Sequence, residues 1–470
     1  MLTRLSLRIR IFLFFCLLAL GGLVVSSVAL WVSYVRLDNP ELLTAFVFAE
    51  ILIGFGMLAM VAGVWLLFDD NIAKPIERLS AELRARAHAG VSTDMDLQAA
   101  RYLGDLAPAA AGLADQLSDK TLNIAEAVAV ETAHLAAEKQ RLTALLTEIP
   151  VAMLLASPTH KIVLYDAQAA EVLAQICHPR LNASLFEYLK PGPLEDAYSK
   201  LVKTGMDVEC KLISIDENQS YSARMKPLGD APGYMLIFED STARISPDAA
   251  RPLVYDFELL HTAAEDALEN RALPDLCFVV FDTETTGLLP HKDEIVQIGA
   301  VRVIKGRIVD SEQLNMLVNP GIPIPAASTK VHKINDRMVQ GAPDIAKAGK
   351  VFHQFARDAV IVAHNAPFDM AFLRRHADDM GVEWTHPILD TVLLSAVLFG
   401  ASDTHTLDAL CERLDITIPN ALRHTALGDA LATAEALVKM LPMLQARGVT
   451  TFGAVLVETR KHGRLLEDLN

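Results

Sequence analysis

The sequence has few cysteines and contains no repeats. Its five cysteines among 470 residues are scattered, and no two of them form a Cys-x-x-Cys pair. That spacing argues against a structural zinc site and is typical of a protein in a reducing cytosol. No internal repeat with a period of about 20–50 residues and no low-complexity tract is visible, so a repeat architecture is not expected.

The sequence also lacks an excess of positive charge. The net charge of the chain is −16, and residues 276–470 carry 19 Lys and Arg against 23 Asp and Glu, a balance of −4. A domain that binds a long nucleic-acid duplex usually shows a basic face. The charge balance therefore argues against a protein that holds an extended duplex.

Two long runs lack charge almost entirely. Ile11 to Val35 contains none, and Thr44 to Phe68 contains only Glu50. Each run exceeds the roughly 20 residues needed to cross a bilayer. The first run is too long for a signal peptide, and a second follows closely. Two transmembrane helices are therefore predicted, at about 11–35 and 44–68, within a membrane-anchor region of residues 1–70.

The basic residues around these runs predict their orientation. Only Arg36 lies between the two runs. Three arginines precede the first run and four basic residues follow the second: Arg4, Arg8 and Arg10, then Lys74, Arg78, Arg84 and Arg86. We expect a multi-pass protein of the inner (cytoplasmic) membrane, with both termini in the cytoplasm.

Residues 71–118 have the pattern of helix, connector and helix directly behind a membrane span. Pro75 is expected to open the first helix, and a Gly/Ser/Thr-containing break near 90–93 separates it from the second. This pattern resembles a HAMP signalling linker, which implies a homodimer. Apolar positions spaced mostly by seven residues then predict a signalling helix over 119–149 with an imperfect coiled-coil seam.

Residues 143–245 predict a small mixed domain. A hairpin around 157–160 is followed by helical segments and by three strand-like runs, at 208–215, 219–227 and 233–239. The last run and its exit resemble the end of a PAS domain, which implies dimerisation and signal relay; the ligand is left open. A partly helical linker follows over 246–274.

Four acids and one histidine stand out in the remaining residues. They are Asp282, Glu284, Asp369, His424 and Asp429. A stable core avoids gathering unpaired carboxylates, because burying them is expensive. Four acids that share divalent cations and one imidazole that accepts a proton from water suit a two-metal phosphodiesterase.

The predicted elements bring these residues together. The apolar run 276–281 reads as a buried strand that delivers Asp282 and Glu284 to one face. Asp369 lies in the first turn of a helix after a short strand at 359–363, and Asp429 lies in a helix that follows His424. We expect an α/β domain with a mixed sheet over 275–445, and a helical tail over 446–470.

Six stretches carry a resemblance to a known family. They are Phe-Asp-Thr-Glu-Thr-Thr-Gly, Glu-Ile-Val-Gln-Ile-Gly-Ala-Val, Val-His-Lys-Ile-Asn-Asp, His-Asn-Ala-Pro-Phe-Asp, Thr-Leu-Asp-Ala-Leu-Cys and His-Thr-Ala-Leu-Gly-Asp. In this order they resemble the DEDDh family of 3′–5′ exonucleases, and within it the proofreading epsilon subunits of bacterial DNA polymerase III. The related tyrosine branch would place Tyr at position 425, where this chain has Thr.

The resemblance implies an RNase H-like fold and a role for each motif residue. The four acids would hold two Mg²⁺ or Mn²⁺ ions, and His424 would act as the general base. Thr285, Thr286 and Asn365 match positions near the terminal nucleotide or supporting the metal ligands. The product would be a nucleoside 5′-monophosphate.

The expected function is a membrane-anchored 3′–5′ exonuclease with HAMP-like and PAS-like regions in front of it. Its partner would be a nucleic-acid 3′ end, with single-stranded or frayed DNA favoured. Two alternatives stay open at this point. One is an exonuclease acting on RNA or short oligonucleotides, and the other is a sensor whose exonuclease-like domain binds nucleotide without cleaving nucleic acid.

Overall fold

The computed structural model describes residues 7–37, 42–89, 101–104, 106, 109, 112, 151–229, 231–239, 253–261, 267–401, 403–419 and 421–470. The chain divides into two compact units, residues 1–122 and 123–470, and each is described by itself. The predicted signalling helix at 119–149, and most of the second helix of the HAMP-like region, lie outside the described residues.

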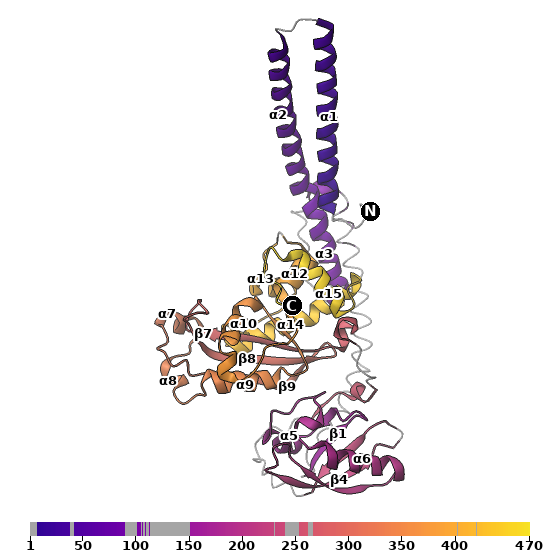
Figure 1. Ribbon diagram of the computed structural model, residues 1–470, viewed down its shortest axis with the longest axis vertical. Helices are drawn as coiled ribbons and strands as arrows, with labels where there is room; N and C mark the ends of the chain where they lie inside the picture. Colours follow the sequence, from indigo (N-terminus) through magenta and orange to yellow (C-terminus); the bar gives the residue numbers. More distant parts are fainter. Residues whose placement is uncertain are drawn as a thin grey trace. The chain divides into compact units, whose positions relative to one another are not determined.

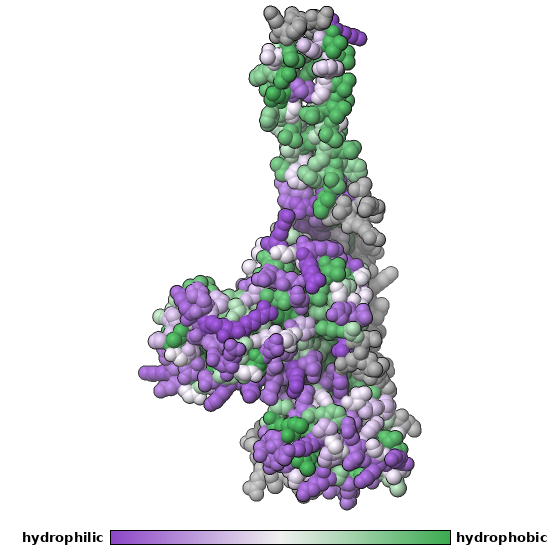
Figure 2. All heavy atoms as spheres, in the orientation of Figure 1, coloured by the Kyte–Doolittle hydropathy of each residue, from purple (hydrophilic) through white to green (hydrophobic). Residues whose placement is uncertain are grey.

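The first unit is built from long helices (Figure 1). Helices α1 (Leu7–Leu37) and α2 (Leu43–Phe68) run side by side. By length and composition, the stretches Arg8–Arg36 and Leu43–Ser80 are each able to cross a membrane. Their visible surface is predominantly apolar (Figure 2). The predicted spans therefore lie within these two helices.

Polar side chains join α1 to α2 at two levels. Ser26 and Ser27 donate hydrogen bonds to the Glu50 carboxylate, at 3.2 and 2.5 Å. Nearer the other end of the pair, the Arg8 guanidinium donates two 2.7 Å hydrogen bonds to Asp69. Charged and hydroxyl groups between apolar helices thus pair with one another.

Pro75 does not open a separate helix, contrary to the sequence-based expectation. A π-helical turn at Asp69–Ala73 connects α2 directly to α3 (Lys74–Ala89). Proline removes one backbone donor and crowds the preceding turn. A π-helical turn accommodates such a local change without ending the helix.

The second unit begins with a six-stranded antiparallel sheet, here called the small module (residues 151–261). The strand order is β3-β4-β5-β1-β2-β6. The strands are β1 Ala152–Ala156, β2 Ile162–Tyr165, β3 Val208–Ile213, β4 Ser220–Pro227, β5 Tyr234–Phe238 and β6 Val254–Tyr255. Helices α5 (Ala167–Ala174) and α6 (Pro191–Thr204) lie between β2 and β3 in the sequence. Strand β6 comes from the segment predicted as a linker.

The rest of the second unit, here called the large domain (residues 267–470), contains a five-stranded mixed sheet of order β11-β10-β7-β8-β9. The strands are β7 Cys277–Thr285, β8 Ile295–Ile304, β9 Arg307–Leu317, β10 Val360–Ala363 and β11 Ile388–Asp390. Strands β7, β8 and β9 form an antiparallel meander, whereas β10 and β11 run parallel to β7. The predicted mixed sheet is confirmed.

Helices cover this sheet and complete the large domain (Figure 1). They are α7 Ala326–His332, α8 Asp336–Val339, α9 Ile345–Phe355, α10 Ala366–Arg375, α11 Ala377–Met380, α12 Thr391–Phe399, α13 Leu407–Arg413, α14 Ala426–Ala446 and α15 Phe452–Thr459. Helix α14 packs on β7, β8 and β9 and continues through Pro442.

Candidate active site

Strand β7 presents two of the predicted acids on one face. Asp282 and Glu284 are half-buried, whereas Thr283 between them is buried on the opposite face. The alternation follows from the strand period of two residues. The pairing with β8 sets Asp282 opposite Gly299 and Glu284 opposite Gln297. Strand geometry alone therefore brings the first two carboxylates together.

Helix α14 brings Asp429 to the same place, because β8 carries a glycine there. A Cβ atom on Gly299 would lie 2.1 Å from the backbone nitrogen of Leu427 and 2.2 Å from the carbonyl carbon of Ala426. The Gln297 amide oxygen accepts a hydrogen bond from the Ala426 nitrogen at 3.2 Å. The first turn of α14, which holds Asp429, is thus docked directly on β8.

Replacing Gly299 by alanine is expected to push α14 away from β8. The added methyl group meets backbone atoms, which yield less easily than side chains, so we expect a loss of about 1–3 kcal/mol of stability. Nuclease activity should fall as well, since Asp429 would move from Asp282. Thermal melting and a nuclease assay check both effects; Gly192→Ala, in open space on α6 and without a left-handed backbone, tests for a general effect of adding a methyl group.

Asp369 lies in the first turn of α10 and is buried. Its carboxylate accepts hydrogen bonds from the backbone nitrogen of Thr283, at 3.1 Å, and from the Thr283 hydroxyl. The buried side chain of Thr283 therefore links β7, which carries two acids, to the helix that carries a third. Thr283 was not singled out from the sequence.

Asp390 fixes the start of the helix that holds Asp369. Its carboxylate accepts hydrogen bonds from the backbone nitrogens of Ala366, at 2.6 Å, and Val392, at 2.7 Å. These bonds satisfy helix N-terminal donors that would otherwise lack partners. The role of Asp390 was not predicted either, since nothing in one sequence distinguishes it from other acids.

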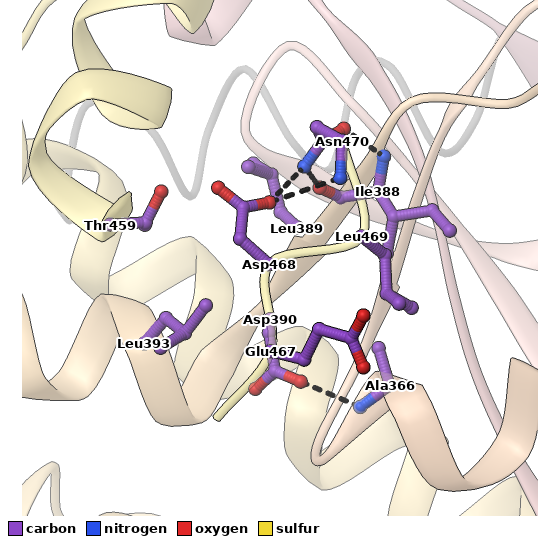
Figure 3. Close-up of a pocket in the computed structure, with 10 residues that line it drawn as sticks. All are labelled: Ala366, Ile388, Leu389, Asp390, Leu393, Thr459, Glu467, Asp468, Leu469 and Asn470. Atoms are coloured by element: carbon purple, nitrogen blue, oxygen red, sulfur yellow. Dashed lines mark hydrogen bonds between the residues drawn. The ribbon is translucent and has the colours of Figure 1, made fainter. Parts of the chain in front are cut away.

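A small pocket lies beside Asp390 and is partly covered by the segment 467–470 (Figure 3). The Asn470 side chain accepts a hydrogen bond from the backbone nitrogen of Ile388 at 2.8 Å and donates one to its carbonyl at 2.5 Å. The segment therefore pairs with β11, the edge strand that ends at Asp390. The predicted tail is part of the large domain's packing.

His424 is exposed and immediately precedes the N-cap of α14. Its backbone is left-handed, with φ of 57°. The imidazole lies close enough to Asp429 to lower the pKa of that carboxyl, although burial outweighs this effect and the net shift is upward. An exposed imidazole next to a cluster of acids is able to accept a proton from a nearby water.

The three predicted substrate residues lie at the edges of the acid cluster. Thr285 ends β7, and its hydroxyl donates to the Gly287 carbonyl at 2.7 Å. The Thr286 hydroxyl accepts from the Glu294 nitrogen at 3.0 Å. Asn365 precedes α10 in a left-handed conformation, with φ of 68°. The two threonine hydroxyls thus have partners within the chain, and Asn365 begins α10 from a left-handed backbone.

The acids present a donor set suited to a hard divalent cation. One oxygen from each of Asp282, Glu284 and Asp429 lies within 4.8 Å of the others. Burial raises the pKa of Asp282 well above its usual range, and the neighbouring carboxylates raise it further. Burial and the charges of Asp429 and Asp369 raise the pKa of Glu284 to about 8. A divalent cation would relieve this repulsion, and oxygen ligands suit Mg²⁺ or Mn²⁺.

The metal-free protein is expected to lose stability as pH rises from about 6.5 to 8.5. The pKa of Glu284 is about 8 and that of Asp369 about 7. The same carboxyls ionise near pH 4 in the unfolded chain. Between pH 6.5 and 8.5 the folded state therefore binds more protons than the unfolded state, and the free energy of unfolding falls as pH rises. Buried His364 and His386 have pKa values of about 4, so they affect the pH dependence of stability only below that window.

Thermal melts of chelator-treated protein at pH 6.5 and 8.5 check this slope. Added Mn²⁺ should raise the melting temperature more at pH 8.5, because protons no longer compete for the ligands. Glu284→Gln should flatten the metal-free slope. A slope of the opposite sign would show that folding does not raise the pKa of these carboxyls.

Comparisons with known proteins identify the family of the chain. Residues 279–437 match the exonuclease family RNase_T. A DNA polymerase III subunit epsilon-like protein of Rhodobacter capsulatus is 34% identical, with the whole of both chains covered. The chain belongs to this epsilon-like exonuclease family. It is a 3′–5′ exonuclease, and exonucleases of this fold use divalent metal ions.

Other relatives match the exonuclease domain, which is the large domain described above. A PolC-type DNA polymerase III of Caldanaerobacter subterraneus is 42% identical over 38% of this chain, and the match spans only 13% of that protein. Exonuclease X in complex with 5′ overhanging duplex DNA aligns with 28% identity and a TM-score of 0.32, over 38% of this chain and 99% of its own. Exonuclease I of E. coli with a dT13 oligonucleotide aligns with 18% identity and a TM-score of 0.33, over 37% and 42%.

Proposed function

We propose that this exonuclease is anchored in the inner membrane and releases nucleoside 5′-monophosphates from DNA 3′ ends. The observation that carries the proposal is the convergence of Asp282, Glu284 and Asp429 around one point. Asp369 adjoins them, and His424 lies beside Asp429. The five residues belong to one site although they come from separated parts of the sequence.

Each residue has a distinct task in this proposal. The four acids would hold two Mg²⁺ or Mn²⁺ ions. When bound, such ions polarise the scissile phosphate and lower the pKa of a coordinated water. His424 accepts the proton of the attacking water at a ring nitrogen and so acts as the general base. Asn365, Thr285 and Thr286 orient the terminal nucleotide.

A short apolar loop next to the acids favours a chain end as substrate. Leu288 is 79% exposed and Leu289 is 43% exposed, directly after the motif that supplies Asp282 and Glu284. Exposed leucines offer a base an apolar contact that an extended duplex would not reach. The net charge of residues 276–470 is −4, which equals the charge of the four acids, and two divalent cations would offset it. Single-stranded or frayed DNA is therefore the proposed substrate.

The N-terminal half supplies the membrane and sensor parts of the proposal. The two apolar helices and the basic residues flanking them support a membrane anchor with both termini cytoplasmic. The antiparallel sheet of the small module, with helices between β2 and β3, supports its PAS-like interpretation. Homodimerisation through the HAMP-like and PAS-like regions, and a ligand of unknown identity, belong to the same proposal.

The test uses the full chain reconstituted in lipid and an oligonucleotide labelled at its 5′ end. With Mn²⁺ or Mg²⁺ present, we expect a ladder of products shortened from the 3′ end, together with nucleoside 5′-monophosphates. Matched RNA and DNA strands run in parallel. Faster cleavage of RNA would overturn the choice of DNA, and binding of the 3′ end without cleavage would favour the sensor alternative.

A further inference from the structure

A buried ion pair lies where the small module contacts the exonuclease domain. Arg302 of β8 and Glu312 of β9 are 2% and 0% exposed, and the guanidinium Nε lies 2.8 Å from Oε2 of the carboxylate. The pairing of β8 with β9 is interrupted between Val301 and Arg302. Residues 310–312 therefore bulge, and Glu312 is the last residue of that bulge.

The small module supplies three hydrogen bonds to this pair. The Leu181 nitrogen and the Tyr165 hydroxyl both donate to Oε1 of Glu312, at 2.5 and 2.9 Å. The Leu181 carbonyl accepts from Nη2 of Arg302 at 3.0 Å. A buried charge without such partners is costly, so removal of the small module would leave both charges inadequately satisfied.

A second set of contacts surrounds the pair. Arg180, also 2% exposed, forms an ion pair with Glu187 and donates a 2.9 Å hydrogen bond to the Arg357 carbonyl. The His178 and Phe355 rings meet edge to face, 5.4 Å apart. Apolar residues of both parts belong to one continuous core. The contact is therefore built like a protein interior.

The ion pair is also connected to the catalytic strands. Nη2 of Arg302 donates to the Sγ of Cys277 at 2.9 Å, and Cys277 is the first residue of β7. Asp282 lies five residues further along β7, at about 17 Å by the rise of a strand. Arg302 itself lies three residues beyond Gly299, the residue opposite Asp282.

We propose that docking of the small module sets the positions of β7 and β8, and thus of Asp282 and Glu284, through the Arg302–Glu312 pair. Arg302 and Glu312 are positioning residues, since neither adjoins the acid cluster. The inference rests on the proposed metal-binding role of the four acids. It gives the small module a physical route by which any change in its docking alters the nuclease.

The test compares Glu312→Gln with the wild-type full chain in lipid. The variant leaves Arg302 buried without a counter-charge. We expect faster hydrogen exchange in residues 178–187 and in β7 and β8, about a tenfold lower kcat, and a several-fold higher Mn²⁺ concentration for half-maximal rate. A partly unfolded sample would lower the rate but leave that Mn²⁺ concentration unchanged. Glu239→Gln, which makes the same change at an exposed ion pair of the small module, is the control.

Two further variants keep the test decisive. Tyr165→Phe removes one hydrogen bond and no charge. It should raise the hydrogen-exchange rate and the Mn²⁺ concentration for half-maximal rate, by less than Glu312→Gln does. This variant still tests the proposal if Glu312→Gln fails to fold. The double variant Arg302→Met/Glu312→Met removes both charges. Its kcat and its Mn²⁺ concentration for half-maximal rate should be closer to the wild-type values than those of Glu312→Gln, because no buried charge is left unpaired.

The proposal is overturned if Tyr165→Phe and a folded Glu312→Gln match the control in exchange and Mn²⁺ requirement. It is also overturned if exchange rises while the Mn²⁺ requirement stays constant, because docking would then not position the acids. A wild-type chain that cuts no oligonucleotide would instead refute the proposed function. Hydrogen exchange and calorimetric Mn²⁺ binding would still test the docking in that case.

Discussion

Replacing Asp282 by asparagine is expected to abolish nucleotide release while leaving the protein folded. Asp282 faces Glu284 and Asp429 at the centre of the acid cluster. Stabilisation of transition-state charge by a metal ion contributes several kcal/mol, and each 1.36 kcal/mol changes a rate about tenfold. Loss of one central ligand should therefore reduce kcat by about 10³-fold or more, measured on the labelled oligonucleotide.

The same substitution should stabilise the metal-free protein. Asp282 is held among like charges, and its pKa is raised for that reason as well as by burial. An amide of the same shape removes the repulsion, so at pH 8 the melting temperature without metal should rise, by about 2–4 °C for each kcal/mol gained. The rise produced by added Mn²⁺ should become smaller than in the wild type.

The opposite signs of these two effects make the prediction specific. Asp378→Asn removes an exposed acid of α11, outside the acid cluster, and should change neither activity nor melting temperature. If Asp282→Asn lost activity together with metal-free stability, the residue would be structural. Unchanged turnover would mean that the active site lies elsewhere in the chain.

Local sequence patterns were sufficient to predict the strands and helices that carry the acids. The apolar run before Asp282 predicts a buried strand, and the structure has β7 there. The short strand before Asp369, the helix that holds Asp369 and the helix after His424 also form where the sequence predicts them. These elements have strong periodicity and clear boundaries, which a single sequence records well.

The contacts that hold the elements together were not predictable in this way. Gly299 admits α14, Thr283 links β7 to Asp369, and Asp390 caps α10. Each role depends on an element distant in sequence, so no local pattern identifies it. One signal was present for Gly299, since a glycine inside a strand often marks a close approach by another backbone.

The buried Arg302–Glu312 pair, at the contact between the small module and the large domain, was not predictable from local patterns either. Arginine and glutamate on consecutive strands would ordinarily be assigned to a solvent-exposed face. Their burial follows from the small module, whose Leu181 and Tyr165 lie more than a hundred residues earlier. Strand β6 arose likewise from a segment whose composition indicated a linker.

Replacing His424 by asparagine is expected to remove the general base without disturbing the site. The backbone of His424 is left-handed, a conformation that asparagine tolerates and alanine does not. Loss of a general base typically lowers a rate by about 10²–10⁴-fold. We expect kcat to fall in that range, while the Mn²⁺-dependent rise in melting temperature is kept because the four acids are unchanged.

The pH profile separates this role from a structural one. A side chain that accepts a proton from water shapes the pH dependence of the rate, so the pH profile of His424→Asn should differ from that of the wild type. His291→Asn, at an exposed histidine in the loop beyond β7, is the control and should retain the wild-type profile. A His424→Asn protein with a reduced rate but an unaltered profile would show that His424 positions Asp429, and that another group accepts the proton.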